Sequence, residues 1–293
     1  MVPVKQFAVL VAAAALFLCP SVGRSGLPTD SLSLSTQETG ASSLFAQSSA
    51  QVLLREFNQP EISFLLLDVK TRELLASRWD DPERRIPMGS LIKPFTALAY
   101  GEQHEFRYPT HVCKGESTGC WRPTGHGAVD LSSAIANSCN SYFRMLTEDM
   151  SAPEVSPTAT EFGLDDPDDG LRGASLAGLG TGWSTSPIHM ARAYLELAQR
   201  RDQPGVNDIL AGMARSARTG TGLEVGRALE HSAALVKTGT AACTHPTRAP
   251  GDGFVVVLFP ANQPEFVLLV RVHRVPGSKA ARVAGQMLRR IGE

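Results

Sequence analysis

The chain has 293 residues, a formal net charge of -1, and 43% hydrophobic and 19% charged residues. This length fits one large domain or two small ones, and the composition is that of a globular protein with an ample core. A near-neutral charge argues against a nucleic-acid-binding protein, which usually carries a basic face, so no nucleic-acid partner is expected.

The first 23 residues have the pattern of a secretory signal. Lys5 precedes an apolar run from Phe7 to Leu18, which is shorter than the roughly 20 residues that a membrane-spanning helix needs. Small residues near Gly23 suit cleavage by a signal peptidase. Residues 1–23 are therefore predicted to be a cleaved signal, the alternative being a membrane anchor formed by residues 7–18. Both readings predict an exported protein, periplasmic or in the cell envelope.

Export would place the remaining cysteines in an oxidising compartment. Cys113 and Cys120 flank a turn-rich loop and are predicted to form a disulfide. Cys139 and Cys243 are expected either to pair or to be small buried thiols, as free cysteines often are. No spacing of cysteines or histidines resembles a zinc site, so neither a metal nor a cofactor is expected.

The N-terminal half of the predicted sheet follows a flexible segment. Residues 24–43 are rich in Ser, Thr, Gly and Gln and are predicted to be a tether, and apolar spacing predicts a helix over 44–57. The continuous apolar run 62–69 predicts a strand covered on both faces. A turn and a second strand over 74–79 complete a hairpin.

The middle of the chain, residues 90–230, is predicted to be helical with long loops. The clearest helices span 128–146 and 187–198, the second with Ser186 as N-cap and Pro187 in its first turn. Strands are predicted over 235–242, 253–259 and 265–275, and a closing helix over 278–291.

These elements predict an α/β (α+β) fold. Two strands precede the helical block and three follow it, and short loops within each group imply antiparallel pairing. We therefore expect a domain over 44–293 with a five-stranded antiparallel sheet flanked by terminal helices (44–89 and 231–293). An all-helical subdomain (90–230) is inserted between its strands.

Three short motifs carry the candidate chemistry. The first, Ser90-Leu91-Ile92-Lys93, puts a hydroxyl and an amine on one face of a helix, although composition alone gives Ser-x-x-Lys roughly once in every few hundred residues. The second is Ser138-Cys139-Asn140, and the third is Lys237-Thr238-Gly239-Thr240 on a predicted strand. A lysine acts as a base only when neutral, and burial with Lys237 nearby would lower the pKa of Lys93. Pro94 predicts a tight or irregular first turn.

The trio in this order resembles the transpeptidase domain of penicillin-binding proteins, and most closely its elongation-type class B members. The likeness extends from about residue 62 to the C-terminus. It includes Cys120-Trp121 followed by Gly125-His126-Gly127, and Thr185-Ser186-Pro187. The resemblance implies a β-lactamase/DD-peptidase-like fold. It also implies action on D-Ala-D-Ala peptidoglycan stem peptides, as a D,D-transpeptidase or D,D-carboxypeptidase, with β-lactams as inhibitors and cell-wall synthesis proteins as candidate partners.

The resemblance further implies residue roles. Ser90 would be the acylated nucleophile, Lys93 its base, and Ser138 a proton relay to the leaving amine. Asn140 would hold the peptide amide of the substrate, and backbone N–H groups of Ser90 and Thr240 would form the oxyanion hole. The group Lys237, Thr238 and Thr240 would bind the C-terminal carboxylate, while Gly239 lets the substrate backbone approach the strand edge.

Two other functions compete with this one. A serine β-lactamase of class A needs an added carboxylate base, and no Glu-x-x-Leu-Asn stretch is present. A non-catalytic module that senses β-lactams or muropeptides, or that scaffolds cell-wall enzymes, would suit the compact size. Departures from the family pattern include Phe254 in place of a tryptophan and Met88 between Pro87 and Gly89.

Overall fold

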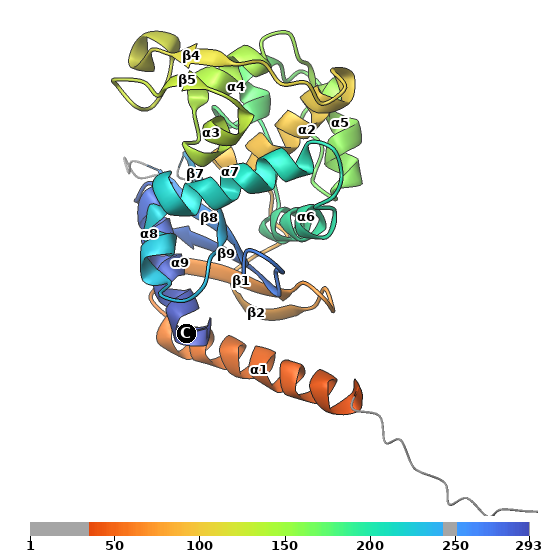
Figure 1. Cartoon of the computed structure of the whole chain (residues 1–293), viewed down its shortest axis with the longest axis vertical. Coiled ribbons are helices and arrows are strands. Elements are labelled where there is room, and N and C mark those ends of the chain that lie inside the picture. The colour runs from red at the N-terminus through yellow and green to blue at the C-terminus, as the bar shows by residue number, and fades with distance from the viewer. Residues whose placement is uncertain (1–34, 243–250, 293) are drawn as a thin grey trace, which may run out of the picture.

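The computed structural model describes residues 35–242 and 251–292 (Figure 1). The predicted signal peptide, residues 24–34 of the predicted tether, and Cys243 lie outside the described residues. Helix α1 (Ser35–Glu56) begins nine residues before the expected helix, so residues 35–43 are helical and not a tether as predicted. None of the described helices combines the length and apolar character required to span a bilayer.

The core of the fold is a five-stranded antiparallel sheet in the order β2-β1-β9-β8-β7. Its strands are β1 (Ile62–Asp68), β2 (Leu74–Arg78), β7 (Leu235–Ala241), β8 (Asp252–Phe259) and β9 (Phe266–Val272). The sheet thus joins an N-terminal hairpin to three C-terminal strands, as predicted, through the pairing of β1 with β9. Strand β7 forms one edge of this sheet.

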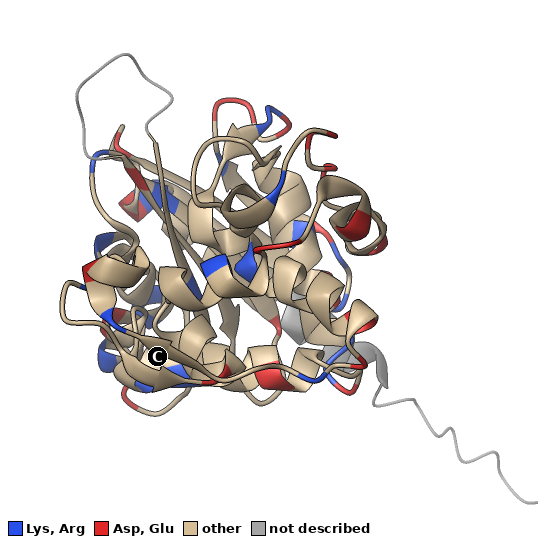
Figure 2. Ribbon diagram, turned by 90° about the horizontal axis from the view of Figure 1, so that it is seen from above, with Lys and Arg blue, Asp and Glu red and all other residues tan. Residues whose placement is uncertain are grey.

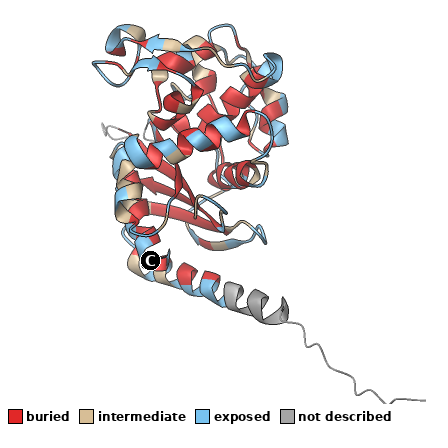
Figure 3. Cartoon of the chain, in the orientation of Figure 1, coloured by how far each residue is buried: buried red, intermediate tan, exposed pale blue. Residues whose placement is uncertain are grey.

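Both faces of the sheet are buried around its central strands, which explains why β1, β8 and β9 are mostly apolar (Figure 3). Side chains alternate along each strand. Leu65 and Val256 face a core shared with the inserted helices. Leu66 and Val257 face a second core shared with α1, α8 (Leu223–Ala228) and α9 (Gly277–Gly292). The prediction that terminal helices cover the sheet is confirmed.

The segment between β2 and β7 is mostly but not entirely helical. Its helices are α2 (Lys93–Gln103), α3 (Leu131–Ala136), α4 (Asn140–Leu146), α5 (Ala152–Glu161), α6 (Pro187–Gln199), α7 (Val206–Thr219) and α8, with 3-10 helices η1 (Gly89–Ile92), η2 (Gly115–Thr118) and η3 (Gly173–Ala177). Two small ribbons correct the all-helical prediction: β3 (Ile86–Pro87) with β6 (Ser184–Thr185), and β4 (His111–Cys113) with β5 (Gly127–Val129). The end of the segment, including Ala217 and Val225, packs into the core on the other face of the sheet.

The helix predicted over 128–146 is wrong as a single element. Residues 127–129 pair as β5, and Asp130 then caps α3 by accepting a hydrogen bond from the Ser133 amide at 2.7 Å. The chain turns again at Ser138, which has a φ of 49°, before α4 starts. Apolar residues recur at helical spacing through both helices because both bury one face in the same core. The hydrophobic pattern of the sequence therefore does not show the break between them.

Charges are mixed over the surface, with Lys and Arg interspersed among Asp and Glu (Figure 2). The cleft described next opens beside β7, where the sheet meets the inserted helices.

Candidate active site

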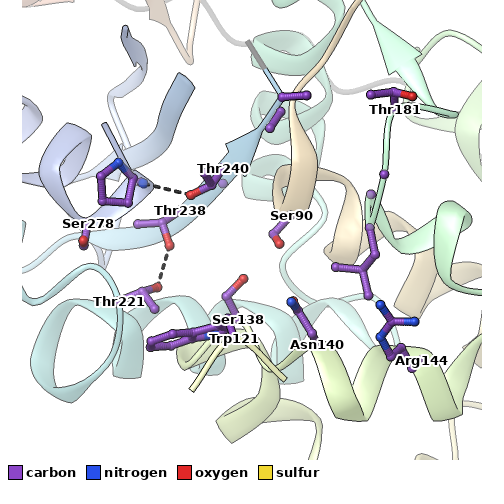
Figure 4. A pocket seen from close by; sticks show the side chains of 18 residues that line it. Ser90, Trp121, Ser138, Asn140, Arg144, Thr181, Thr221, Thr238, Thr240 and Ser278 are labelled. Atoms are coloured by element: carbon purple, nitrogen blue, oxygen red, sulfur yellow. Dashed lines mark hydrogen bonds between the residues drawn. The ribbon is translucent and has the colours of Figure 1, made fainter. Parts of the chain in front are cut away.

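A cleft of about 480 Å³ is lined by residues from all three motifs. From the predicted site residues it collects Ser90, Ser138, Asn140, Thr238, Gly239 and Thr240 (Figure 4). The two lysines, Lys93 and Lys237, are both fully buried, with 0% exposure. The first and third motifs, from Ser90 to Thr240, are 150 residues apart in sequence and meet at one cleft.

Ser90 lies on the 3-10 helix η1, which continues directly into α2, so the tight first turn predicted from Pro94 is confirmed. Residues three apart eclipse one another in a 3-10 helix, which keeps Ser90 and Lys93 on the same side. Gly89 has a φ of 55°, and a Cβ there would come within 2.2 Å of the Thr240 carbonyl oxygen. Glycine at this position is what lets η1 lie against the edge strand β7.

Lys93 is arranged to act as a neutral amine. Its Nζ donates to the Ser138 carbonyl oxygen at 3.1 Å and to Asn140 Oδ1 at 2.7 Å. A neutral amine has two N–H groups, so these bonds leave its lone pair free. The pKa of Lys93 is lowered to about 7, mainly by burial and to a smaller extent by the guanidinium of Arg144. The cation that lowers the pKa of Lys93 is therefore Arg144, whereas the sequence suggested Lys237.

Ser138 is the junction of the two buried lysines. Its carbonyl oxygen accepts from Lys93, and its Oγ accepts from Lys237 Nζ at 3.0 Å. Ser138 also has a left-handed backbone, a conformation that costs a non-glycine residue about 1–3 kcal/mol and is often found at active sites. Burial, followed by the charge of Lys93, holds the pKa of Lys237 well below its usual value, so the pair favours at least one neutral amine.

The third motif presents an edge strand to the cleft. Thr238 Oγ1 donates to Thr221 Oγ1 at 2.6 Å, and Thr240 Oγ1 accepts from the Gly277 amide at 3.0 Å. A Cβ on Gly239 would lie 2.5 Å from the Met88 carbonyl oxygen. The edge of β7 can therefore lie this close to η1 only with glycine at position 239. The resemblance implied that this glycine makes room for the substrate backbone, and the structure shows that it makes room for η1.

Sequence reasoning missed several residues that line the cleft. They are Trp121, Arg144, Thr181, Thr221 and Ser278. Arg144 could have been predicted from the sequence, because it follows Asn140 by one helical turn and therefore shares its face of α4. The others come from loops or from the start of α9, and nothing in their local sequence marks them.

The predicted disulfide between Cys113 and Cys120 is wrong, because both are free thiols. Cys139 is also a free, buried thiol. The Sγ atoms of Cys113 and Cys120 each lie 3.5 Å from His126 Nδ1, and the Sγ atoms of Cys120 and Cys139 are 3.9 Å apart. The four side chains thus converge on one point instead of pairing, with their ligand atoms all within 4.8 Å of one another.

This cluster fits a tetrahedral metal ion. Zinc bonded to sulfur at about 2.3 Å and to nitrogen at about 2.05 Å would separate S and N by about 3.5 Å, and two S atoms by about 3.8 Å. Burial lowers the pKa of His126, which favours the neutral imidazole that binds metals. Burial raises the pKa of Cys139 to about 12, so a thiolate there requires a cation. Bound zinc would hold Cys139 between Ser138 and Asn140, and its chemistry would be structural.

The sequence pattern missed this cluster because its ligands come from separate segments. Cys113 ends β4, Cys120 follows η2, and Cys139 is the residue before α4. Zinc sites recognised from sequence usually show two close pairs of ligands, and here only the pairing of β4 with β5 and the docking of α4 complete the set.

We expect the purified chain to contain one zinc ion, measured by elemental mass spectrometry after preparation without chelators. Cys120→Ser should weaken zinc binding by more than about 100-fold, since the loss of outer partners alone costs 10–100-fold, and should lower the Tm. His111→Gln is the matched control, because His111 lies on β4 and contacts Ser141 at 2.6 Å outside the cluster. A reconstituted chain that binds no zinc, or equal loss in both variants, would refute the site.

Comparison with known proteins supports the fold and the family. The sequence model of the penicillin binding protein transpeptidase domain matches residues 62–293. A comparison with curated protein sequences found no significant match.

Solved structures similar to the chain come from the same family. Pseudomonas aeruginosa PBP2, solved with WCK 5153, is 18% identical with a TM-score of 0.66, covering 85% of this chain and 73% of that one. Helicobacter pylori PBP2, solved with MreC, is 17% identical with a TM-score of 0.70, covering 84% and 63%. The Burkholderia pseudomallei PBP3 domain is 19% identical with a TM-score of 0.63, covering 86% and 92%. At these identities the likeness concerns the fold.

Proposed function

The chain belongs to the family of penicillin-binding protein transpeptidase domains, and on this premise we propose that it is a serine acyltransferase. Its substrates would be peptidoglycan stem peptides ending in D-Ala-D-Ala. The reaction would be D,D-transpeptidation or D,D-carboxypeptidation through an acyl-enzyme on Ser90.

One observation carries this proposal. Ser90 lines the same cleft as Ser138 and Asn140. Two fully buried lysines, Lys93 and Lys237, lie next to this cleft, and the pKa values of both are lowered. A serine hydroxyl is a weak nucleophile until a base removes its proton. Lys93 meets the requirement for such a base, because at pH values above about 7 its amine is mostly neutral.

In the proposed acylation, Ser90 Oγ attacks the carbonyl carbon of the penultimate D-Ala while Lys93 takes the hydroxyl proton. Backbone N–H groups of Ser90 and Thr240 would stabilise the oxyanion, an effect worth a factor of about 10²–10³. The C–N bond then breaks, and the proton passes through the Ser138 hydroxyl to the leaving D-Ala amine. The carbonyl carbon remains bonded to Ser90.

Substrate would bind along the edge strand β7. Its C-terminal carboxylate would meet the hydroxyls of Thr238 and Thr240, with Lys237 beneath them. Because Asn140 Oδ1 already accepts from Lys93, the Asn140 amide group remains to donate to a substrate carbonyl. Water as acceptor would complete a carboxypeptidase reaction, and an amine would complete a transpeptidase reaction.

Labelling with a fluorescent penicillin tests the proposal. We expect a stable adduct on a gel, located by mass spectrometry in the peptide that contains Ser90, and release of D-Ala from a D-Ala-D-Ala donor. A chain that never labels would refute the proposal. Rapid turnover of a chromogenic cephalosporin would favour a β-lactamase, and labelling without D-Ala release would favour a sensor or scaffold.

Location and partners are part of the same proposal. We propose an exported protein of the periplasm or cell envelope, since its substrate would lie there. The H. pylori relative was solved as a complex with MreC, and a cell-wall synthesis protein is the partner we propose for this chain.

A further inference from the structure

The cleft has an unusual charge distribution. Of the 18 residues that line it in the described part of the chain, Arg144 is the only one with a charged side chain. The two lysines of the motifs are fully buried below it. The accessible wall of the cleft therefore carries one fixed positive charge, which belongs to none of the three motifs.

Arg144 is positioned by its surroundings. It lies on α4 one turn after Asn140, so both side chains face the cleft. Its Nε donates to the Gly119 carbonyl oxygen at 3.3 Å. A Cβ on Gly119 would lie 2.7 Å from that Nε, so glycine there makes room for the guanidinium. Exposed arginines are often only solvated, but this one is anchored through Nε.

The terminal nitrogens of Arg144 remain available. Within residues 35–242 and 251–292, its guanidinium forms no ion pair and no second hydrogen bond. A guanidinium held by Nε presents a planar edge of N–H donors, which matches the two oxygens of a carboxylate. Part of the cleft wall is therefore complementary to an anion.

The position of Arg144 indicates which part of a donor peptide it would meet. Thr238 and Thr240 lie on one side of Ser90, and Asn140 and Arg144 lie on the other (Figure 4). A peptide whose C-terminal carboxylate lies at the two threonines extends its N-terminal part past Ser90 toward Asn140. The residue that precedes D-Ala-D-Ala would then have its side chain nearest to the guanidinium.

We propose that Arg144 is a specificity-determining residue that binds a side-chain carboxylate on the donor residue preceding D-Ala-D-Ala. The inference rests on the proposed function and deepens it. The preferred substrates are donors with a free carboxylate at that residue, and donors with a neutral or amidated side chain are disfavoured.

The test compares two donors that differ in one group. The first is N-acetyl-(L-α-aminopimelyl)-D-Ala-D-Ala with a free side-chain carboxylate, and the second has that carboxylate converted to a carboxamide. The readout is the ratio of their kcat/KM values for D-Ala release. The ratio of their potencies in slowing penicillin labelling gives the same information without turnover. Because both donors use the same catalytic groups, any effect of a variant on Lys93 cancels in the ratio.

For the unaltered chain we expect the carboxylate donor to be preferred by about 10-fold. Arg144→Gln should bring the ratio to about 1, and Arg144→Lys should give an intermediate value, because it keeps the charge but loses the planar fork. Arg122→Gln is the matched control, since Arg122 is an exposed arginine of the neighbouring loop that does not line the cleft. Its ratio should stay that of the unaltered chain.

The outcomes separate this inference from the proposed function. Penicillin labelling of Ser90 with no donor preference, or a preference that survives Arg144→Gln, overturns the inference and leaves the proposed function standing. A preference lost equally in Arg122→Gln also overturns it, because the effect would be one of general charge. Absence of both labelling and D-Ala release overturns the two together.

Discussion

Replacing Ser90 with alanine is expected to abolish covalent labelling by penicillin and to lower D-Ala release by at least about 10⁴-fold. The other motif hydroxyls that line the cleft are already hydrogen-bonded. Ser138 Oγ accepts from Lys237, and Thr238 Oγ1 donates to Thr221. No second nucleophile is therefore placed to take over. Gel fluorescence and intact-protein mass spectrometry would measure the loss.

Ser278→Ala is the matched control for this prediction. Ser278 lines the same cleft, and the proposed reaction gives it no role, so labelling should stay within about 3-fold of the unaltered chain. Circular dichroism and Tm would show that Ser90→Ala is folded. A covalent adduct that persists in Ser90→Ala would mean that another residue is the nucleophile.

The second large effect concerns the protonation of Lys93. Burial lowers its pKa to about 7, and the neutral amine is the active form in the proposed reaction. The acylation rate should therefore be nearly constant above pH 8 and fall with decreasing pH through about 7, by about 10-fold for each further pH unit. The Lys93→Ala variant should lose about 10²–10⁴-fold in acylation rate, the usual contribution of a general base.

The control for Lys93 is Lys114→Ala, an exposed lysine outside the cleft, which should keep both the rate and the pH profile. Arg144→Gln offers a further check on the sign, because Arg144 lowers the pKa of Lys93. Its loss should move the acidic limb of the profile to higher pH. A rate that increases as pH falls below 7 would contradict the role of Lys93 as a neutral base.

Much of the fold could be predicted from local pattern. The apolar run at 62–69 and the three C-terminal strands gave the sheet, because a strand buried on both faces must be apolar throughout. Pro94 predicted the tight turn of η1. The motif residues could be named because their chemistry depends on residue types at short spacing, as in Ser90 and Lys93.

Other features depended on distant packing. The helix break falls at Ser138, whose carbonyl and hydroxyl oxygens accept hydrogen bonds from the distant Lys93 and Lys237. The sequence showed only continued apolar periodicity there. The helical start of α1 at Ser35 was likewise hidden, since its residues have the composition of a tether.

The sequence by itself determined which residues carry the candidate chemistry, since a nucleophile, a base and a glycine-bearing edge strand each have a local signature. Only the tertiary structure decided what surrounds them. It made Cys113, Cys120, His126 and Cys139 one cluster instead of a disulfide loop, and it placed the charge of Arg144 on the cleft wall. The physical reason is that burial, pKa shifts and ligand geometry arise from contacts between segments far apart in the chain, and no spacing along the sequence records those contacts.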